Sequence, residues 1–339
     1  MLRESFLDNK QITLKEIAKL AGVSTSTASR ALDERFDNYN SKIAKNIREI
    51  AEKHGYIRNI IASNLRRGTT RTIGVLVPYL SDTVMALLYE NIANIAERHN
   101  YFTVVATAGN SKEREREVIK SLLDRKVDAL ILATCSLDDE NIASLRRNKI
   151  PHSLILRTDG QSYSSIGDDK AGAYIATKHL IDLGHKKIAL INGPIKSSNS
   201  KYRQEGFIEA MKTSNLKLNK DWIINLGFDI KSGEKSGDIL FSSKKERPTA
   251  IFATNDELAI GVMSSAYNHG IAIGKDVSII GYGDIPLSSR LPIPLTTIQI
   301  PFEYMAERAF NLAINNQGHY PLINMVTPTL ISRKSTSKI

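Results

Sequence analysis

The sequence predicts an α/β protein that consists of a small helical N-terminal module, a short connecting helix and two successive lobes of doubly wound parallel β-sheet. Two patterns indicate this organisation. In the first part of the chain, apolar residues recur at intervals of three and four, as on one face of a helix. Further along, short apolar runs alternate with longer polar segments, as in repeated strand–helix units. The predicted boundaries are 1–56 for the helical module, 57–70 for the connecting segment and 71–339 for the core.

Residues 12–32 are typical of two short helices joined by a tight turn. Thr13 and Glu16 form a capping box, in which each side chain bonds the backbone N–H of the other residue. Gly22 supplies the backbone freedom that a sharp stop requires. The inner faces are predicted to be Leu14, Ile17, Ala18 and Ala21 in the first helix, and Ala28, Ala31 and Leu32 in the second. The outward face of the second helix then holds Thr25, Ser26, Ser29 and Arg30. A helix-turn-helix of this kind can lay its second helix in the DNA major groove.

A third helix is predicted over residues 41–54, capped by Asn40 or Ser41 and ended by Gly55. Its inner face is predicted to be Ile43, Ile47, Ile50 and Ala51. Three helices of this size make a small self-contained core, although any three-helix domain has similar apolar stripes. The charge distribution separates these alternatives. Residues 1–71 hold fourteen Lys or Arg and eight Asp or Glu, which is +6 of the chain's net charge of +10. A localised basic surface is typical of phosphate binding.

The connecting segment, residues 56–71, permits one or two helical turns that are too short to be stable alone. One interpretation is a basic linker. The other is a hinge that folds on DNA and inserts Leu65 into the minor groove between base steps.

Seven apolar runs predict strands of the core, with helical segments between them such as 84–99 and 112–126. The runs are TIGVLV, FTVVA, DALILA, SLIL, KIALIN, TAIFA and VSIIGY. The predicted N-lobe comprises about 71–168 and 300–327, and the C-lobe about 169–299 and 328–335. Ligands of such sheets bind beyond the carboxyl ends of the strands, so a cleft between the lobes is expected to hold a ligand.

Composition excludes several classes of protein. No run of about 18 apolar residues is present, and the first ten residues have no apolar segment, so neither a membrane span nor an export signal is expected. The single Cys135 cannot form an internal disulfide, which suits the cytoplasm, and its position in an apolar run predicts a packed thiol. No phosphate loop, HExxH or GxSxG motif occurs. We therefore expect no enzyme activity, no catalytic residue, no cofactor and no metal site.

Five segments in order resemble the lactose/galactose repressor (LacI/GalR) family of bacterial transcriptional regulators. They are the helix-turn-helix, the connecting segment YIRNIIASNLRRG (56–68), ATKHLIDLGHKKIA (176–189), TAIFATNDELAIG (249–261), and DVSIIGY with PLTTI (276–298). The resemblance covers nearly the whole chain. It implies homodimers whose paired modules bind a pseudo-palindromic operator with a central CG step, while a periplasmic-binding-protein-like core binds a small-molecule effector. The chain ends without a leucine heptad, so a dimer and not a tetramer is expected.

On the family's pattern, Thr25, Ser26 and Arg30 occupy base-reading positions, with Ser29 on the same face. Arg30 can form two hydrogen bonds to guanine, whereas the two hydroxyls are short and tolerant. The predicted hinge and minor-groove residues are Asn59, Ala62 and Leu65. The predicted contacts to the DNA backbone are Thr13, Ser24, Thr27, Lys42 and Arg58. Arg58 replaces the usual proline before the hinge, which removes a preset φ, and Ala44 stands where the family often has an arginine.

The effector residues are carried over from the same resemblance. Arg203 matches the family arginine that holds ligand hydroxyls or a carboxylate, although it could also be a solvated helix arginine. Asp256 matches a family position, and it could instead cap the helix of residues 257–269. The complete predicted set is Asp82, Met85, Arg157, Asp168, Arg203, Asn255, Asp256, Gly283 and Asp284.

Two departures remove carboxylates that would bind vicinal hydroxyls in a sugar. Gly283, followed by Asp284, stands where an aspartate is usual, and Leu156 with Arg157 replaces another. Asp82 and Met85 also belong to a loop that lacks the usual aromatic pair. Arg157 and Arg203 together would suit an anionic effector such as a sugar acid or sugar phosphate.

The sequence thus predicts a repressor of carbohydrate-catabolism genes that is released by its effector. A corepressor-dependent regulator of nucleoside or purine metabolism is the alternative. A solute-binding protein would share the two lobes, but it would need an export signal and would lack the helical module. Ligand and operator are expected to be linked reciprocally, because both depend on the same lobe and hinge geometry.

Overall fold

The computed structural model describes residues 12–32, 41–57, 68–242, 246–315 and 321–339. Internal contacts divide the chain into two compact units, with the division between Thr70 and Arg71. Asn40 and the predicted DNA contacts Arg58, Asn59, Ala62 and Leu65 lie outside the described residues. Within the described ranges, no helix is long and apolar enough to cross a membrane.

The N-terminal unit contains the helices α1 (Leu14–Leu20), α2 (Thr25–Ala31) and α3 (Lys42–Lys53). Local side chains determine where each helix begins. The capping box of α1 is complete, because the Thr13 hydroxyl accepts from Glu16 N and Glu16 Oε2 accepts from Thr13 N at 2.7 Å. Ser24 caps α2, and Ser41 caps α3 by accepting from Ala44 N at 3.2 Å.

The core of this unit forms where α1, α2 and α3 pack together. Ile17, Ala28 and Ile47 have no exposed surface. The prediction for the inner face of α3 is wrong at Ile43, which is 54% exposed, because Ala44 takes the inner position. Residues 44, 47 and 51 are spaced by three and four, so residue 43 lies about 100° away around the helix axis.

The N-lobe of the C-terminal unit is a parallel six-stranded sheet in the order β11-β5-β4-β3-β1-β2. Its strands are β1 (Thr72–Val77), β2 (Phe102–Thr107), β3 (Ala129–Leu132), β4 (His152–Ile155), β5 (Ser164–Gly167) and β11 (Ile323–Val326). Its helices are α5 (Thr83–Arg98), α6 (Lys112–Asp124), α7 (Glu140–Arg147) and α12 (Phe302–Ile314).

The C-lobe repeats this design in the order β12-β10-β9-β8-β6-β7. Its strands are β6 (Ile188–Asn192), β7 (Ile223–Asn225), β8 (Ala250–Ala253), β9 (Ser278–Gly283), β10 (Thr296–Gln299) and β12 (Thr329–Ile331). Its helices are α8 (Asp169–Asp182), α9 (Ser198–Thr213), α10 (Ile230–Phe241) and α11 (Asp256–Asn268). One departure from the predicted parallel sheet lies at the edge, where β12 pairs antiparallel with β10.

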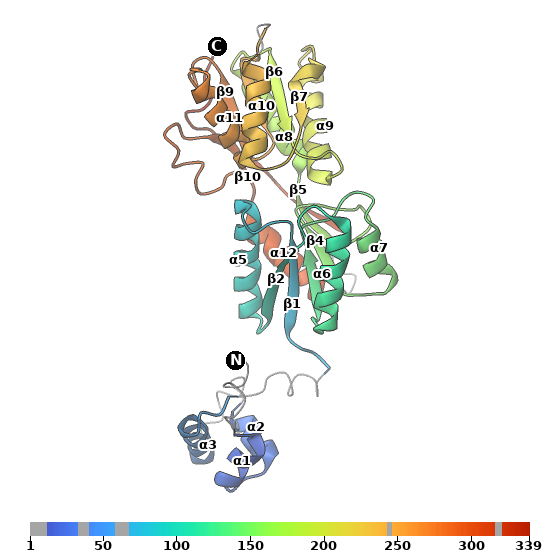
Figure 1. The fold of residues 1–339 in the computed structure, drawn as a ribbon, viewed down its shortest axis with the longest axis vertical. Helices are drawn as coiled ribbons and strands as arrows, with labels where there is room; N and C mark the ends of the chain where they lie inside the picture. The colour runs from blue at the N-terminus through green and yellow to red at the C-terminus, as the bar shows by residue number, and fades with distance from the viewer. Residues whose placement is uncertain (1–11, 33–40, 58–67, 243–245, 316–320) are drawn as a thin grey trace, which may run out of the picture. The chain divides into compact units, whose positions relative to one another are not determined.

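Both faces of each sheet are covered by helices, so alternate residues of the central strands enter different cores. In β3, Ile131 joins the core beneath α5 and α12, whereas Leu130 and Leu132 join the core beneath α6 and α7. Figure 1 shows α5 and α6 on opposite sides of the N-lobe strands.

The chain passes between the lobes three times, at 167–169, 299–302 and 326–329. Strands of both sheets end toward these crossings, which places their carboxyl ends around a shared cleft.

Candidate functional site

The outward face of α2 presents the predicted base-reading residues. Thr25, Ser26 and Arg30 are exposed, and Ser29 is half-buried. No acidic residue lies in α2, so nothing on this helix repels phosphate. The hydroxyls of the predicted backbone contacts Thr13, Ser24 and Thr27 belong to the helix caps, whereas Lys42 is exposed at the start of α3. This arrangement presents short polar groups and one guanidinium on a single helical surface.

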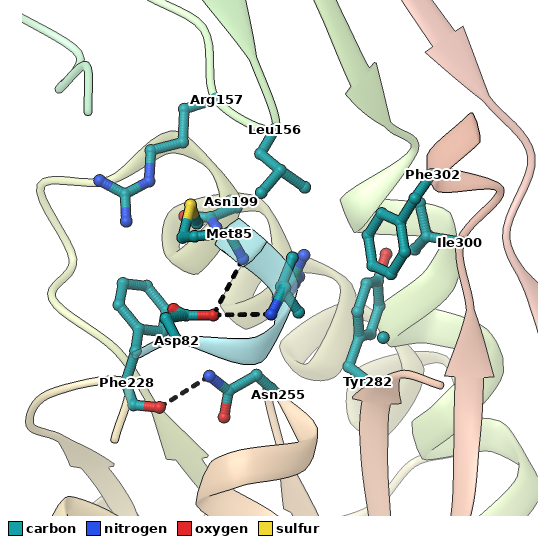
Figure 2. A pocket seen from close by; sticks show the side chains of 13 residues that line it. Asp82, Met85, Leu156, Arg157, Asn199, Phe228, Asn255, Tyr282, Ile300 and Phe302 are labelled. Carbon is teal, nitrogen blue, oxygen red and sulfur yellow. Dashed lines mark hydrogen bonds between the residues drawn. The ribbon is translucent and has the colours of Figure 1, made fainter. Parts of the chain in front are cut away.

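In the C-terminal unit, the strand ends of both lobes surround a small pocket, called the inner pocket below. It is lined by Asp82, Val84, Met85, Leu156, Arg157, Asn199, Arg203, Phe228, Asn255, Tyr282, Gly283, Ile300 and Phe302. The lining residues come from the start of α5, the loops after β4 and β7, the first turns of α9 and the carboxyl ends of β8, β9 and β10. Figure 2 shows Tyr282, Ile300 and Phe302 gathered on one side, away from Arg157 and Phe228.

Six of the nine predicted effector residues line the inner pocket, and three do not. The three outside it are carboxylates that already hold local structure. Asp168 caps α8 by accepting from Ala171 N at 3.0 Å. Asp284 bonds Arg333 and Gln299.

Asp256 is the third of these carboxylates. It is 1% exposed, and its oxygens accept from Ile285 N, the Ser288 hydroxyl and the Thr297 hydroxyl. The prediction that Asp256 caps its helix is wrong, because Asn255 is the N-cap of α11 and accepts from Leu258 N at 2.7 Å. The amide of Asn255 also donates to Phe228 O at 2.8 Å, so Asn255 joins the helix start to the pocket wall (Figure 2).

Arg203 lines the inner pocket and already has partners within the C-lobe. Its Nε and one terminal nitrogen each lie 2.7 Å from Asp169 Oδ1, and its other terminal nitrogen donates to Thr254 O. The guanidinium also stacks 3.7 Å from the ring centroid of Tyr282. Arg203 is 6% exposed, so the solvated-arginine alternative is excluded. Sequence reasoning missed Asp169, which fixes the orientation of this arginine.

Arg157 has a different environment. It is 8% exposed, and among the described residues it forms neither an ion pair nor a hydrogen bond through Nε. Its guanidinium lies 5.4 Å from the ring centroid of Phe228, and burial lowers its pKa. A buried charge without a counter-ion is costly. Such a cation in a pocket wall is therefore typical of a site for an anion.

Asp82 begins α5 and faces the same pocket. Its Oδ1 accepts from Val84 N at 2.9 Å and from Met85 N at 3.3 Å. Burial, together with the charge of Glu257, raises the pKa of Asp82 to about 6. Glu257 belongs to α11 of the other lobe and accepts from both the backbone N–H and the hydroxyl of Thr83. This is a direct hydrogen-bonded contact across the cleft.

The pKa of Asp82 predicts how the pH affects the stability of the core. In the unfolded chain this carboxyl titrates near 3.8, so between the two pKa values the folded state holds the proton more tightly. Its contribution to the free energy of unfolding therefore rises as the pH falls through 6. Asp82→Asn keeps a capping side chain but removes the charge. We expect the urea midpoint of Asp82→Asn to be higher than that of wild type at pH 7.5. Near pH 4 the two midpoints should be nearly equal. A difference between the two midpoints that does not change with pH would contradict the raised pKa of Asp82.

Sequence reasoning missed the apolar part of the pocket, especially Phe228, Ile300 and Phe302. Phe228 follows the three-residue strand β7, which has too short an apolar run to be recognised. Tyr282 lies in the recognised VSIIGY run, so its position at a strand end was the available signal. Cys135 is fully buried, and burial raises its pKa to about 12, which agrees with a packed and unreactive thiol.

These features define a class: a helix-turn-helix DNA-binding unit joined to a two-lobed α/β core with a ligand cleft. Comparisons with known proteins give the family. Residues 13–59 match the model for bacterial regulatory proteins of the lacI family, and residues 177–336 match a periplasmic binding protein-like domain. The HTH-type transcriptional repressor PurR of Vibrio vulnificus (strain CMCP6) is 31% identical over 336 residues, which cover 96% of this chain and 99% of that protein. The chain belongs to the LacI family of transcriptional regulators, which confirms the resemblance and the regulatory, non-enzymatic role.

Solved structures agree on the fold. The lac repressor dimer bound to operator and the anti-inducer ONPF is 25% identical and matches with a TM-score of 0.84, covering 97% of this chain and 100% of that one. A LacI family regulator from Enterococcus faecium with bound ribose is 29% identical, with a TM-score of 0.69, and covers 79% and 99% of the two chains. The predicted fold class is thus confirmed.

Proposed function

We propose that this LacI-family regulator represses carbohydrate-catabolism genes as a cytoplasmic homodimer on a pseudo-palindromic operator, and that an anionic small molecule in the inter-lobe cleft releases it. The observation that carries the ligand class is Arg157, a buried guanidinium with no counter-ion among the described residues. Arg203 adds a second cation to the pocket wall, but Asp169 already neutralises it. A sugar acid or sugar phosphate would supply the missing negative charge.

The DNA-binding half of the proposal rests on the exposed surface of α2. Arg30 can form two hydrogen bonds to a guanine edge, while Thr25 and Ser26 allow close approach to neighbouring bases. Phosphate contacts supply affinity without sequence information, so specificity is assigned to these three residues.

The effect of Arg30 on operator affinity tests this half. Arg30→Ala is expected to cost about 1–3 kcal/mol on a palindrome with a central CG step, because one bidentate base contact is lost. Binding to scrambled DNA should change much less. Arg30→Lys separates charge from geometry, because lysine keeps the positive charge but cannot form the two parallel hydrogen bonds of a guanidinium. If the geometry matters, Arg30→Lys should also bind the palindrome more weakly. Fluorescence anisotropy at fixed salt measures all three proteins. Equal losses on specific and scrambled DNA would contradict base reading by Arg30.

A purine or nucleoside corepressor is the second candidate that the sequence allows. A neutral base would leave Arg157 without a counter-ion, so the structure favours it less than an acid. Thermal-shift measurements with sugar acids, sugar phosphates, neutral sugars and nucleosides separate these classes, because a ligand of the native state raises the melting temperature.

A further inference from the structure

A second and larger cavity, called the outer cavity below, adjoins the inner pocket. Its volume is about 740 Å³, whereas that of the inner pocket is about 40 Å³. Ligand sites usually have volumes of about 300–1,000 Å³. The inner pocket is therefore too small for a sugar-sized ligand in this conformation, and the outer cavity has room for one.

The two spaces share only Arg157 and Phe228 among their lining residues. Figure 2 shows this pair on the side of the inner pocket that faces away from Tyr282, Ile300 and Phe302. A ligand bound to the guanidinium can therefore extend outward over Phe228.

Both lobes contribute to the outer cavity. The N-lobe supplies the turn 109–111, the start of α6 and the segment 134–141, which leads from β3 into the start of α7. The C-lobe supplies the loop 194–197 after β6. The two sides already meet there, because Leu137 N donates to Lys196 O at 3.2 Å. A ligand in this cavity would touch both lobes.

The two buried carboxylates of the outer cavity, Glu115 and Asp139, share one cation and are otherwise held by neutral donors. Lys112 Nζ pairs with Glu115 at 2.7 Å and with Asp139, and Asn141 Nδ2 donates to Glu115 at 3.0 Å. Thr134 also donates to Glu115, and Ser136 N donates to Asp139 at 3.0 Å. Lys112 is therefore occupied, and Arg157 remains as the buried cation without a counter-ion. The hydroxyl oxygens of Thr134 and Ser136 can still accept hydrogen bonds from a ligand.

We propose that the effector binds in the outer cavity, with one anionic group on Arg157 and a hydroxyl-rich body between Asn110, Ser136 and Lys196. This inference rests on the proposed anionic effector and gives it a place and a form. One unpaired guanidinium suits one negative charge, and the neighbouring Asp82 disfavours a second. The ligand class is thus a monoanionic polyhydroxylated acid, whose carboxylate matches the fork of an arginine.

Calorimetry on the full-length chain tests the location with gluconate, galactonate, glucuronate and galacturonate. Glucose is the neutral comparison ligand for these acids, and glucose 6-phosphate is the dianionic comparison ligand. Asn110→Trp and Lys196→Trp each fill the outer cavity from an exposed position, so both variants should fold. Val84→Leu is the control, because Val84 lines the inner pocket only.

We expect at least one acid to bind to wild type more tightly than glucose and glucose 6-phosphate. Both tryptophan variants should weaken that binding by roughly tenfold or more, and Val84→Leu should change it by less than about threefold. If Val84→Leu weakened binding strongly and the tryptophan variants did not, the outer cavity would not be the site. If glucose 6-phosphate bound more tightly than every acid, the ligand would not be a monoanion. If none of the acids binds, the inference is wrong, while the effect of Arg30→Ala on operator binding still decides the DNA-binding proposal separately.

Discussion

Asp169→Ala is expected to lower the free energy of unfolding of the core by about 3–5 kcal/mol, because it leaves the buried charge of Arg203 without its counter-ion. Asp169 and Arg203 are 3% and 6% exposed, and two nitrogens of the guanidinium lie 2.7 Å from one carboxylate oxygen. The remaining contacts of Arg203, with Thr254 O and the face of Tyr282, do not neutralise the charge. Urea unfolding of the full chain measures the loss.

The next residue along the chain provides the control. Lys170 pairs with Glu209 at 2.7 Å, but both side chains are about half exposed, so Lys170→Ala should leave the unfolding midpoint unchanged. A double replacement, Asp169→Leu with Arg203→Met, should recover much of the stability that the single variant loses. Equal midpoints for Asp169→Ala and Lys170→Ala would contradict the importance assigned to the buried pair.

In contrast to Asp169→Ala, Arg157→Met is expected to stabilise the ligand-free protein. Because Arg157 is buried without a counter-ion, methionine of similar length should raise the free energy of unfolding by about 1–4 kcal/mol. Arg203→Met is the matched variant, and it should destabilise because it leaves Asp169 unpaired. A residue that weakens the fold and yet lies in a pocket wall is best explained by its ligand.

The same variant should lose the response to acids. In wild type, a bound acid offsets the isolated charge and raises the melting temperature, whereas Arg157→Met should show no shift with the same acid. If Arg157→Met proved strongly destabilising, the guanidinium would have a structural partner and the ligand assignment would be wrong.

The sequence predicted the central elements well because their signals are local. Buried parallel strands such as β1 and β3 are continuous apolar runs, and the cap residues Thr13 and Ser41 bond within their own first turns. The strands β5, β7, β10, β11 and β12 lie outside the seven predicted runs. β5 (SSIG) and β10 (TTIQ) contain few apolar residues, and β7 and β12 have only three residues each. Packing partners decide such short elements, and a single sequence does not display them.

The binding cleft was predictable in part. A departure from the family pattern already drew attention to Arg157, but its lack of a counter-ion depends on which side chains surround it in space. Three carboxylates that the family resemblance assigned to the effector, Asp168, Asp256 and Asp284, lie outside the inner pocket. Their oxygens are used by a helix cap, a strand-end network and Arg333, and none of these contacts is visible in a motif.

The central claim is that DNA reading by α2 depends on an anion at Arg157. The most direct test is an anisotropy titration of the palindromic operator with wild type and Arg157→Met, each with and without a saturating sugar acid identified by thermal shift. Coupling between two sites is typically worth about 1–3 kcal/mol. We predict that the acid weakens operator binding by wild type about five- to 150-fold and leaves Arg157→Met unchanged. An equal shift in both proteins, or a response of wild type to neutral sugars alone, would contradict the claim.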